Sequence, residues 1–568
     1  MKISQQGRHY LLPLLVLIVL AGILRARLNF SSEMIPGING GYYPLLVRNL
    51  LEYGAIRYPD TPFVYWLEAI FSLVIRLFSG MTLDQSILLA SRLADSFIPP
   101  LTCIPVFLFA SYQLKDKPGS KFMIHLISWF SVLYLAFLLV LTSEMQKNAM
   151  GMVWLACFFY SVSRIKEDNS CKYLIISVLF LTLIALTHIG CFAVAFLFIL
   201  IFAAILLIQS RRSVKVKTIL WVLLVLSAMI LFSFLLLRHD PDRLHRVISF
   251  YLNPLRLFES PYLLILLSGQ QPYFGFLFHN FLLINILSIA GLILILFHRS
   301  RLTTFEFTFA LSLLFLSLLL SSPLLGIEWA LRYYLMAFLP IAFASVFVFK
   351  TLTIKFQKIF FLMVFVVITG FSLGIGFNAS RSPSISEESL AALIEMKEET
   401  NIRPNELIIA RHGLEWWTGW VLRCRTGKEY CLKKEDWDKY PGIYLLKQLS
   451  GNNFPGQQGT GQFAEFPVPG SAEKIYSNSS FVLYKLGRPL AMEYYPGELP
   501  LLQGEIKSVT DSELVIRAQG YRQLVILNPS TGYIDGKKED LKVGMRADVW
   551  GRRVPFSLNI KAERIRAY

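Results

Sequence analysis

The sequence predicts a polytopic α-helical membrane protein with about eleven membrane-spanning helices and two interfacial helices in its first outer loop. A C-terminal extracytoplasmic part, made of an α/β unit and a small β-barrel, is expected to follow. Of the 568 residues 55% are hydrophobic, and the mean hydropathy is +0.53, which is more apolar than a soluble chain of this length. Runs of 18 or more apolar residues recur from Leu11 to Phe377. Backbone groups in hydrocarbon must bond within their own segment, so these runs are predicted to be helices.

The charges of the loops set the predicted topology. Eleven spans are predicted near 10–26, 95–114, 122–141, 149–163, 173–187, 191–210, 218–237, 277–297, 305–321, 331–349 and 359–377. The loops that this topology places inside are all basic: KDKPGSK, RIKEDNSCK, RRSVKVK, HRSR and KTLTIKFQK. The short outer loops SEMQKN, THIG and SSPLLGIEW together hold one Lys and no Arg. By the positive-inside rule the N-terminus is cytoplasmic, and an odd number of spans puts the C-terminal tail outside.

The net charge of +17 need not mean nucleic-acid binding, because Lys and Arg gather in the cytoplasmic loops of a membrane protein. The first span has no A-x-A-like cleavage site after it and is expected to stay as an anchor. The chain is therefore expected to be a multi-pass protein of the cytoplasmic (inner) membrane.

The first outer loop is expected to run from about residue 28 to residue 94. PFVYWLEAIFSLVIRLF (62–78) must not cross the membrane, because every later loop would then invert. It is 17 residues long and carries Glu68 and Arg76, so we predict a helix lying in the outer interface. YYPLLVRNLLEYG (42–54) is interpreted in the same way, with Gly54 as the helix stop.

The tail begins after the polar linker ASRSPSIS (379–386). SEESLAALIEMKEET is predicted to be a helix with Ser386 as N-cap, and the segments 406–410, 442–447 and 479–486 are predicted to be strands. From Leu501 alternating strands and turns predict a small β-barrel. The predicted domains are 1–380, 381–495 and 496–568. A turn at Thr426-Gly427 would bring Cys424 and Cys431 together as a disulfide; two free thiols are the alternative.

Polar side chains gather in the separate outer loops, and ionisable residues at membrane depth mark function by default. The candidates are Glu33, Asn39, Tyr42, Tyr43, Arg48 and Asp60 in the first loop, Glu144 and Lys147 in the second, His188 in the third, and Arg332 at the outer end of a span. A carboxylate can take a proton from an acceptor hydroxyl. Cations, or a metal held by carboxylates, can stabilise a phosphate leaving group.

Several of these residues also have a structural interpretation. Asp60 would cap the helix that follows it, and Glu144 would form a surface pair with Lys147 at i+3. Arg332 would be a snorkelling anchor, and His188 a satisfied core residue.

The stretches GINGGYYPLLVRNLLEYG, YPDTPFVYWLEA and SEMQKNAM carry a resemblance to a family. Over roughly residues 10–380 the chain resembles the C-type membrane glycosyltransferases that use polyprenyl-phosphate sugars, including protein O-mannosyltransferases and the transferases that modify lipid A. The resemblance implies transfer of a sugar from a polyprenyl-phosphate donor to a lipid-linked glycan, a cell-envelope polymer or a protein at the outer face. It implies that Asp60 and Glu144 lie near the phosphate, with or without Mg²⁺ or Mn²⁺. Lys147 and Arg332 would contact the phosphate, and His188 would line the pocket.

The chain departs from the family pattern at Asn39, where the family usually has its catalytic Asp. An amide cannot act as a general base, so the catalytic candidates are Glu33, Asp60 and Glu144. Asn39, Tyr42, Tyr43, Arg48, Lys147, His188 and Arg332 are the expected substrate-binding residues. Two other functions stay open: a transporter or flippase for a lipid-linked sugar, and a non-catalytic envelope assembly protein with the enzyme fold.

Overall fold

The structure is a computed structural model. It describes residues 5–568 except 116, 118–119, 166–169, 210–251, 253, 270–274, 354, 429–431, 433–434, 450–467, 469–471, 489–499, 519–520 and 535. The predicted span 218–237, the inside loop 211–217 and Cys431 therefore lie outside the described residues.

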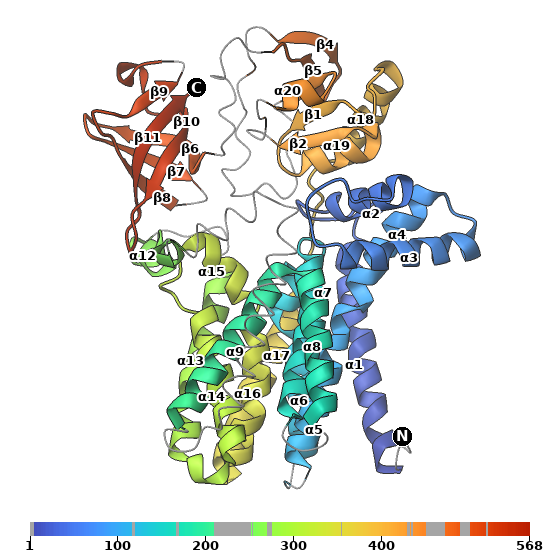
Figure 1. The fold of residues 1–568 in the computed structure, drawn as a ribbon, viewed down its shortest axis with the longest axis vertical. Helices are drawn as coiled ribbons and strands as arrows, with labels where there is room; N and C mark the ends of the chain where they lie inside the picture. Colours follow the sequence, from blue (N-terminus) through green and yellow to red (C-terminus); the bar gives the residue numbers. More distant parts are fainter. Residues whose placement is uncertain are drawn as a thin grey trace.

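Each of the remaining predicted spans is covered by helical segments, and long helices run side by side in a bundle (Figure 1). The bundle helices are α1 (Gln5–Asn29), α5 (Cys103–Leu114), α6 (Ser120–Leu133), α7 (Gln146–Ser163), α8 (Ser170–Thr187), α9 (Ile189–Gln209), α13 (Gly275–Phe297), α14 (Thr304–Leu320), α16 (Phe338–Thr351) and α17 (Lys355–Asn378). Six helices of the described chain are long and apolar enough to cross a membrane, and three shorter apolar helices accompany them. With the β-rich tail described below, the predicted fold class is confirmed.

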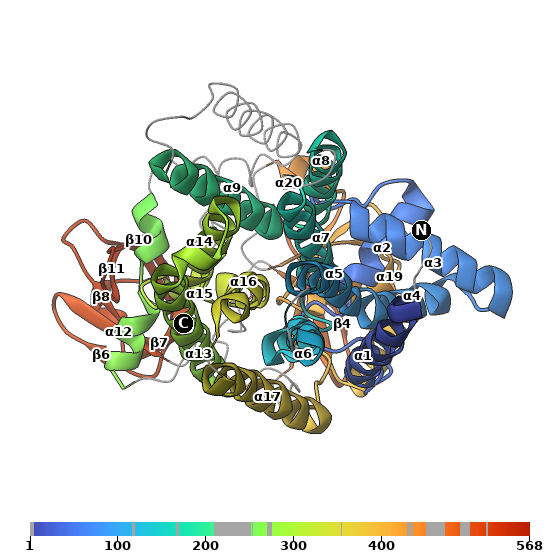
Figure 2. The ribbon, with the colours of Figure 1, turned by 90° about the horizontal axis from the view of Figure 1, so that it is seen from below.

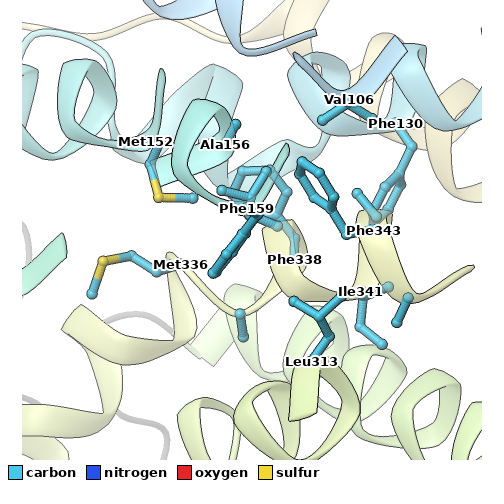
Figure 3. Packing of buried hydrophobic residues seen from close by; sticks show 14 of the residues in the cluster. Val106, Phe130, Met152, Ala156, Phe159, Leu313, Met336, Phe338, Ile341 and Phe343 are labelled. Atoms are coloured by element: carbon cyan, nitrogen blue, oxygen red, sulfur yellow. The ribbon is translucent and has the colours of Figure 1, made fainter. Parts of the chain in front are cut away.

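Helix α16 is the centre of the bundle (Figure 2). In the window Arg332–Thr351, 94% of the residues are buried, against 28% in the window of the peripheral α17. Aromatic rings from neighbouring helices meet there (Figure 3): the ring centroids of Phe109 and Phe343 are 4.9 Å apart, and those of Phe159 and Phe343 are 5.5 Å apart. Such ring pairs and close packing hold membrane helices together, because lipid offers no hydrophobic drive between them.

Three further helices lie at the end of the bundle that also carries the tail, opposite the N-terminus (Figure 1). We call this the outer end, following the predicted topology. Helices α2 (Tyr42–Tyr53) and α3 (Phe63–Ser79) match the two predicted interfacial helices, and both end at a left-handed glycine, Gly54 and Gly80. Helix α3 lies across the bundle and leaves an apolar stripe exposed, including Trp66, Ile70, Leu73, Leu77 and Phe78.

The sequence analysis did not predict the third outer helix, α4 (Leu83–Phe97). It continues through a short 3₁₀ turn, η1 (Pro99–Thr102), into α5. Polar residues scattered through this segment obscure the helical pattern of its apolar residues. A capping box between Thr82 and Gln85 marks the start of the helix.

Helix α3 buries one carboxyl group completely. Glu68 is 0% exposed, and neither of its oxygens accepts a hydrogen bond from any residue that the structure describes. Burial raises the pKa of Glu68 from 4.5 to about 8, and the nearby negative charge of Asp95 adds to the rise. The folded protein therefore holds this proton at neutral pH.

Replacing Glu68→Gln is expected to stabilise the protein at pH 7. The folded-state pKa lies above the unfolded one, so unfolding releases a proton between pH 4.5 and about 8, and stability falls as pH rises through that window. The amide has no proton to lose, so the variant gains on the wild type across the same window, by up to roughly 3 kcal/mol at pH 7. Thermal unfolding at pH 5, 7 and 8 measures this. A stability difference that does not grow between pH 5 and pH 8 would contradict the buried, protonated carboxyl.

The first part of the tail is an α/β unit built on a five-stranded sheet. Strands β1 (Leu407–Ala410), β2 (Arg425–Lys428), β3 (Ile443–Gln448), β4 (Glu473–Ser477) and β5 (Phe481–Lys485) stand in the order β2-β1-β3-β5-β4. Its helices are α18 (Glu387–Glu399), α19 (Leu414–Leu422) and α20 (Asp436–Lys439). Ser386 caps α18 as predicted, accepting from the Ser389 backbone N–H.

The turn predicted at Thr426-Gly427 is wrong. Both residues belong to β2, which pairs with β1 in parallel. The backbone is therefore extended at the place where a turn between Cys424 and Cys431 was predicted. Cys424 is a buried free thiol, whose pKa burial raises to about 12.

The last part of the chain is a six-stranded β-barrel. Its strands are β6 (Leu502–Val509), β7 (Glu513–Ala518), β8 (Tyr521–Ile526), β9 (Gly532–Ile534), β10 (Arg546–Arg553) and β11 (Asn559–Ala567). Their order is β10-β6-β7-β8-β11-β9, and a further pairing of β10 with β11 closes the sheet. The domain boundaries at 380 and 495 remain predictions.

Candidate functional site

Asp60 is the centre of a polar cluster between the outer helices and the bundle. Its side chain is 0% exposed. Its Oδ2 accepts hydrogen bonds from the Tyr65 hydroxyl (2.5 Å), the Tyr42 hydroxyl and the Lys147 ammonium. Its Oδ1 accepts from the Thr61 backbone N–H at 2.8 Å. This carboxylate thus joins α2, α3 and α7 at one point.

The interpretation of Asp60 as a simple helix cap is not supported. Helix α3 begins at Phe63, and its N-cap position, Pro62, has no side-chain cap. The Thr61 hydroxyl instead donates to the Thr187 carbonyl at 2.8 Å. That bond fixes the Asp60 loop against the end of α8. The Asp60 side chain therefore belongs to the polar cluster and not to the N-terminus of α3.

Two tyrosines keep the cluster rich in donors. Burial, followed by the negative charge of Asp60, raises the pKa of both Tyr42 and Tyr65 well above the usual value. They therefore stay neutral and donate their protons to Asp60. The Lys147 ammonium lies 5.5 Å from the centre of the Tyr42 ring and 6.0 Å from that of Tyr65. Tyr43 is also buried, with its ring 5.4 Å from that of Tyr42.

Glu144 forms a second cluster, on the GINGG segment. It accepts from the Ile38 backbone N–H (2.7 Å) and from the Asn39 side-chain amide (2.9 Å). It pairs with Arg381 at 3.4 Å, so its ion partner is not the predicted Lys147, which pairs with Asp60. The backbone comes so close at Gly37 (φ +89°) that an added Cβ would lie 2.5 Å from the carboxylate.

This geometry gives the departure at position 39 a role. Asn39 donates a hydrogen bond that an Asp could not donate, because an ionised carboxylate only accepts. An Asp there would also face Glu144 as a like charge. The chain therefore has a carboxylate at 144, held by an amide at 39.

A buried ionic network fixes the turn that carries Glu144. Ser143 has a left-handed backbone (φ +62°). Its N–H donates to Asp95 at 2.8 Å, and its hydroxyl to the Asn29 side-chain oxygen at 2.7 Å. Asp95 also pairs with Arg25 at 2.8 Å, and both side chains are 0% exposed. The network is therefore structural support for the site from within the membrane.

The linker between bundle and tail supports the same turn from the other side. Arg381 donates to the carbonyls of Leu139 (3.0 Å), Val140 (3.4 Å) and Thr142 (2.5 Å). Leu139 and Val140 belong to the end of a π-helical turn, η2 (Ala136–Val140), and Thr142 lies just beyond it, so Arg381 holds the chain that leads into the Glu144 turn.

The α/β unit also contributes to the walls. The Trp416 ring on α19 packs edge-on against Tyr42, with centroids 4.6 Å apart, and lies 5.7 Å from Tyr58. Arg48 is buried in this interface and donates to the carbonyls of Gly419 (2.9 Å) and Trp420 (2.6 Å). Arg48 thus docks α2 on α19, and its role in substrate binding stays a prediction.

The three other candidates make none of the four hydrogen bonds to Asp60 described above. Glu33 is exposed and lines a cavity of about 330 Å³ with Arg92 and residues of α4. His188 accepts from the Cys191 backbone N–H at 3.2 Å, one residue after the Thr187 carbonyl that holds the Asp60 loop. Arg332 is exposed on α15 (Ile327–Tyr334) at the outer end, and it forms no ion pair within the described part of the chain.

Tyr65 and Arg381 were not predicted as site residues, and the aromatic pair Trp416-Trp417 fitted an interfacial belt as well as sugar stacking. The sequence position of Tyr65 could have indicated its role, because it lies five residues after Asp60 at the start of the predicted interfacial helix. No local pattern indicates a role for Arg381, because nothing in a polar linker shows that it contacts a distant turn.

The residues present do not fit a cation shared by Asp60 and Glu144. Each carboxylate already has a cationic partner, Lys147 and Arg381 respectively. Among the described residues no three His, Cys, Asp or Glu side chains lie together as a metal-binding group.

No family model and no curated relative matches the chain. Solved structures do: ArnT from Cupriavidus metallidurans in the apo state has a TM-score of 0.49 at 11% identity, over 85% of this chain and 98% of that chain. The structure of the same protein bound to undecaprenyl phosphate has a TM-score of 0.45 at 10% identity, over 83% and 97%. Both matches extend over most of this chain and nearly all of the matched chain.

Proposed function

We propose that the protein is a glycosyltransferase of the cytoplasmic membrane, with its tail outside. It moves a sugar from a polyprenyl-phosphate donor to a hydroxyl of a lipid-linked glycan, a cell-envelope polymer or a protein. The observation that carries the proposal is the buried Asp60–Lys147 pair at the outer end of the bundle. Two neutral phenol hydroxyls donate hydrogen bonds to its carboxylate. A carboxylate, an ammonium and hydroxyl donors are the groups that such a transfer needs.

In the resting protein Lys147 neutralises Asp60. The donor phosphate competes for the ammonium, and the neutral Tyr42 and Tyr65 hydroxyls are donors of the kind that phosphate oxygens accept. Once Lys147 turns to the phosphate, Asp60 is a carboxylate without its cation and can take a proton.

In the transfer step the acceptor oxygen attacks the anomeric carbon. The bond from that carbon to the phosphate oxygen breaks, and the electron pair leaves with the polyprenyl phosphate. The acceptor proton passes to Asp60 and then to water. Lys147 stabilises the charge that develops on the leaving phosphate. Glu144, already held by Asn39 and Arg381, keeps the GINGG segment beside the reacting groups.

Replacing Lys147→Met is expected to weaken binding of undecaprenyl phosphate by about 10–100-fold, because a charge-assisted hydrogen bond contributes roughly 1.5–3 kcal/mol. Native mass spectrometry of the purified protein measures the dissociation constant. Lys350→Met is the matched control, since Lys350 pairs with Glu306 at 2.5 Å at the opposite end of the bundle, and it should leave binding unchanged. Equal effects of the two substitutions would contradict a phosphate site at Lys147.

A further inference from the structure

The turn that joins β10 to β11, residues 554–557, lies against the outer end of the bundle. We call it the barrel tip. The Phe556 N–H donates to the Phe258 carbonyl at 3.0 Å, and the Ser260 N–H donates to the Ser557 carbonyl at 3.1 Å. Arg553 donates to the Ser260 hydroxyl at 3.1 Å. These bonds attach the barrel to the loop between η3 (Pro254–Phe258) and α12 (Tyr262–Leu267).

The barrel tip nevertheless presents an apolar surface to the outside. Phe556 is 55% exposed and has a left-handed backbone (φ +54°), which is unfavourable for a bulky residue. Its ring stacks on Phe258, with centroids 5.1 Å apart and an interplanar angle of 15°. Three leucines of the neighbouring segments are exposed as well: Leu255 on η3, Leu267 on α12 and Leu324 in the loop before α15, at 49%, 74% and 47%.

The place of this patch in the fold identifies what covers it. Helix α12 and the lower end of the barrel lie at the level where the membrane helices end (Figure 1). Helix α3 lies at the same level on the other side of the bundle, with Leu77 78% and Phe78 83% exposed. Two apolar surfaces at one level, on opposite sides of a membrane bundle, fit a single bilayer surface.

We propose that the barrel tip inserts into the outer interface of the bilayer. Phe556 and the leucines beside it then contact the lipid headgroup and acyl boundary. The protein rests on the membrane at two places, α3 on one side and the barrel tip on the other. The hydrogen bonds to residues 258 and 260 hold the turn at that depth. Burial of the Phe556 ring in lipid offsets the cost of its left-handed backbone and of its exposure to water.

The test uses the full-length protein in lipid nanodiscs of phosphatidylethanolamine and phosphatidylglycerol. A photo-reactive phenylalanine, p-benzoylphenylalanine, is placed at Phe556, at Leu77 as positive control, and at Val543 as negative control. Val543 is 64% exposed and precedes β10, so about 26 Å of strand separates it from the tip. After illumination, mass spectrometry measures the lipid attached to each variant.

Lipid attachment at 556 is expected to match that at 77 and to exceed that at 543 about tenfold. Attachment at 556 no greater than at 543, with labelling at 77 intact, would overturn the proposal. If the variant at 556 fails to fold, a cryo-electron microscopy map of the unmodified protein in the same nanodiscs decides. Phe556 within the lipid belt supports the proposal, and Phe556 above a layer of water overturns it.

Discussion

Replacing Asp60→Asn is expected to lower the rate of sugar transfer by about 10²–10⁴-fold, the usual contribution of general acid–base catalysis. Asparagine keeps the size of the side chain and one acceptor oxygen, but its NH2 group only donates and the amide cannot take the acceptor proton. Binding of undecaprenyl phosphate should change much less, because Lys147 and the two tyrosines remain. The measurement is transfer from undecaprenyl-phosphate sugars by the purified protein in detergent, with donor affinity determined separately.

Glu33→Gln is the matched control for this result. Glu33 is an acid of the same outer loop that the sequence also nominates as a base, but it is exposed and faces Arg92. Its loss should leave the transfer rate within a factor of about 3, as for a surface residue away from the site. If the transfer rate fell with Glu33→Gln and stayed unchanged with Asp60→Asn, Glu33 and not Asp60 would be the base, which would contradict the proposal.

Replacing Asp95→Ala is expected to destabilise the protein by about 3–5 kcal/mol, the typical cost of removing one partner of a buried ion pair. Arg25 would keep a fully buried charge, and the Asn29 amide and the Ser143 N–H would lose an acceptor. Unfolding in mixed micelles with increasing sodium dodecyl sulfate measures the free energy.

Two comparisons make this result specific. The double variant Arg25→Leu/Asp95→Leu removes both charges and should be more stable than Asp95→Ala, because no uncompensated ion remains. Asp438→Ala breaks the exposed pair with Arg488, whose side chains are 64% and 58% exposed, and should leave stability unchanged. A small effect of Asp95→Ala would mean that the network does not hold the Ser143 turn.

The sequence predicted the membrane part of this fold well because its signals are local and strong. Apolar runs located the helices, and loop charges required 62–78 to stay out of the bundle, as α3 does. The polar helix α4 went unpredicted, because its apolar face is narrow and its residues pack on α1 and α3. In the tail, β2 was mistaken for a turn, because a parallel pairing with β1 has no local signature in the sequence.

The site was only partly predictable for the same reason. Asp60 and Lys147 are 87 residues apart, and loop topology placed them on one face without showing that they touch. Arg48 and Arg381 show the limit most clearly. Arg48 was predicted to bind substrate, and nothing in the sequence indicates that α19 supplies acceptors for it. Arg381 lies in a polar linker, and nothing local shows that it bonds to the turn before α7.

The most direct test of the Asp60–Lys147 site is a cryo-electron microscopy structure of the protein with undecaprenyl phosphate. The predicted result is phosphate density in contact with Lys147, beside Tyr42 and Tyr65, with the Lys147 ammonium drawn away from Asp60. Phosphate density elsewhere, such as the cavity beside Glu33 and Arg92, with the Asp60–Lys147 pair intact, would contradict the proposed site and the role of Asp60 in it.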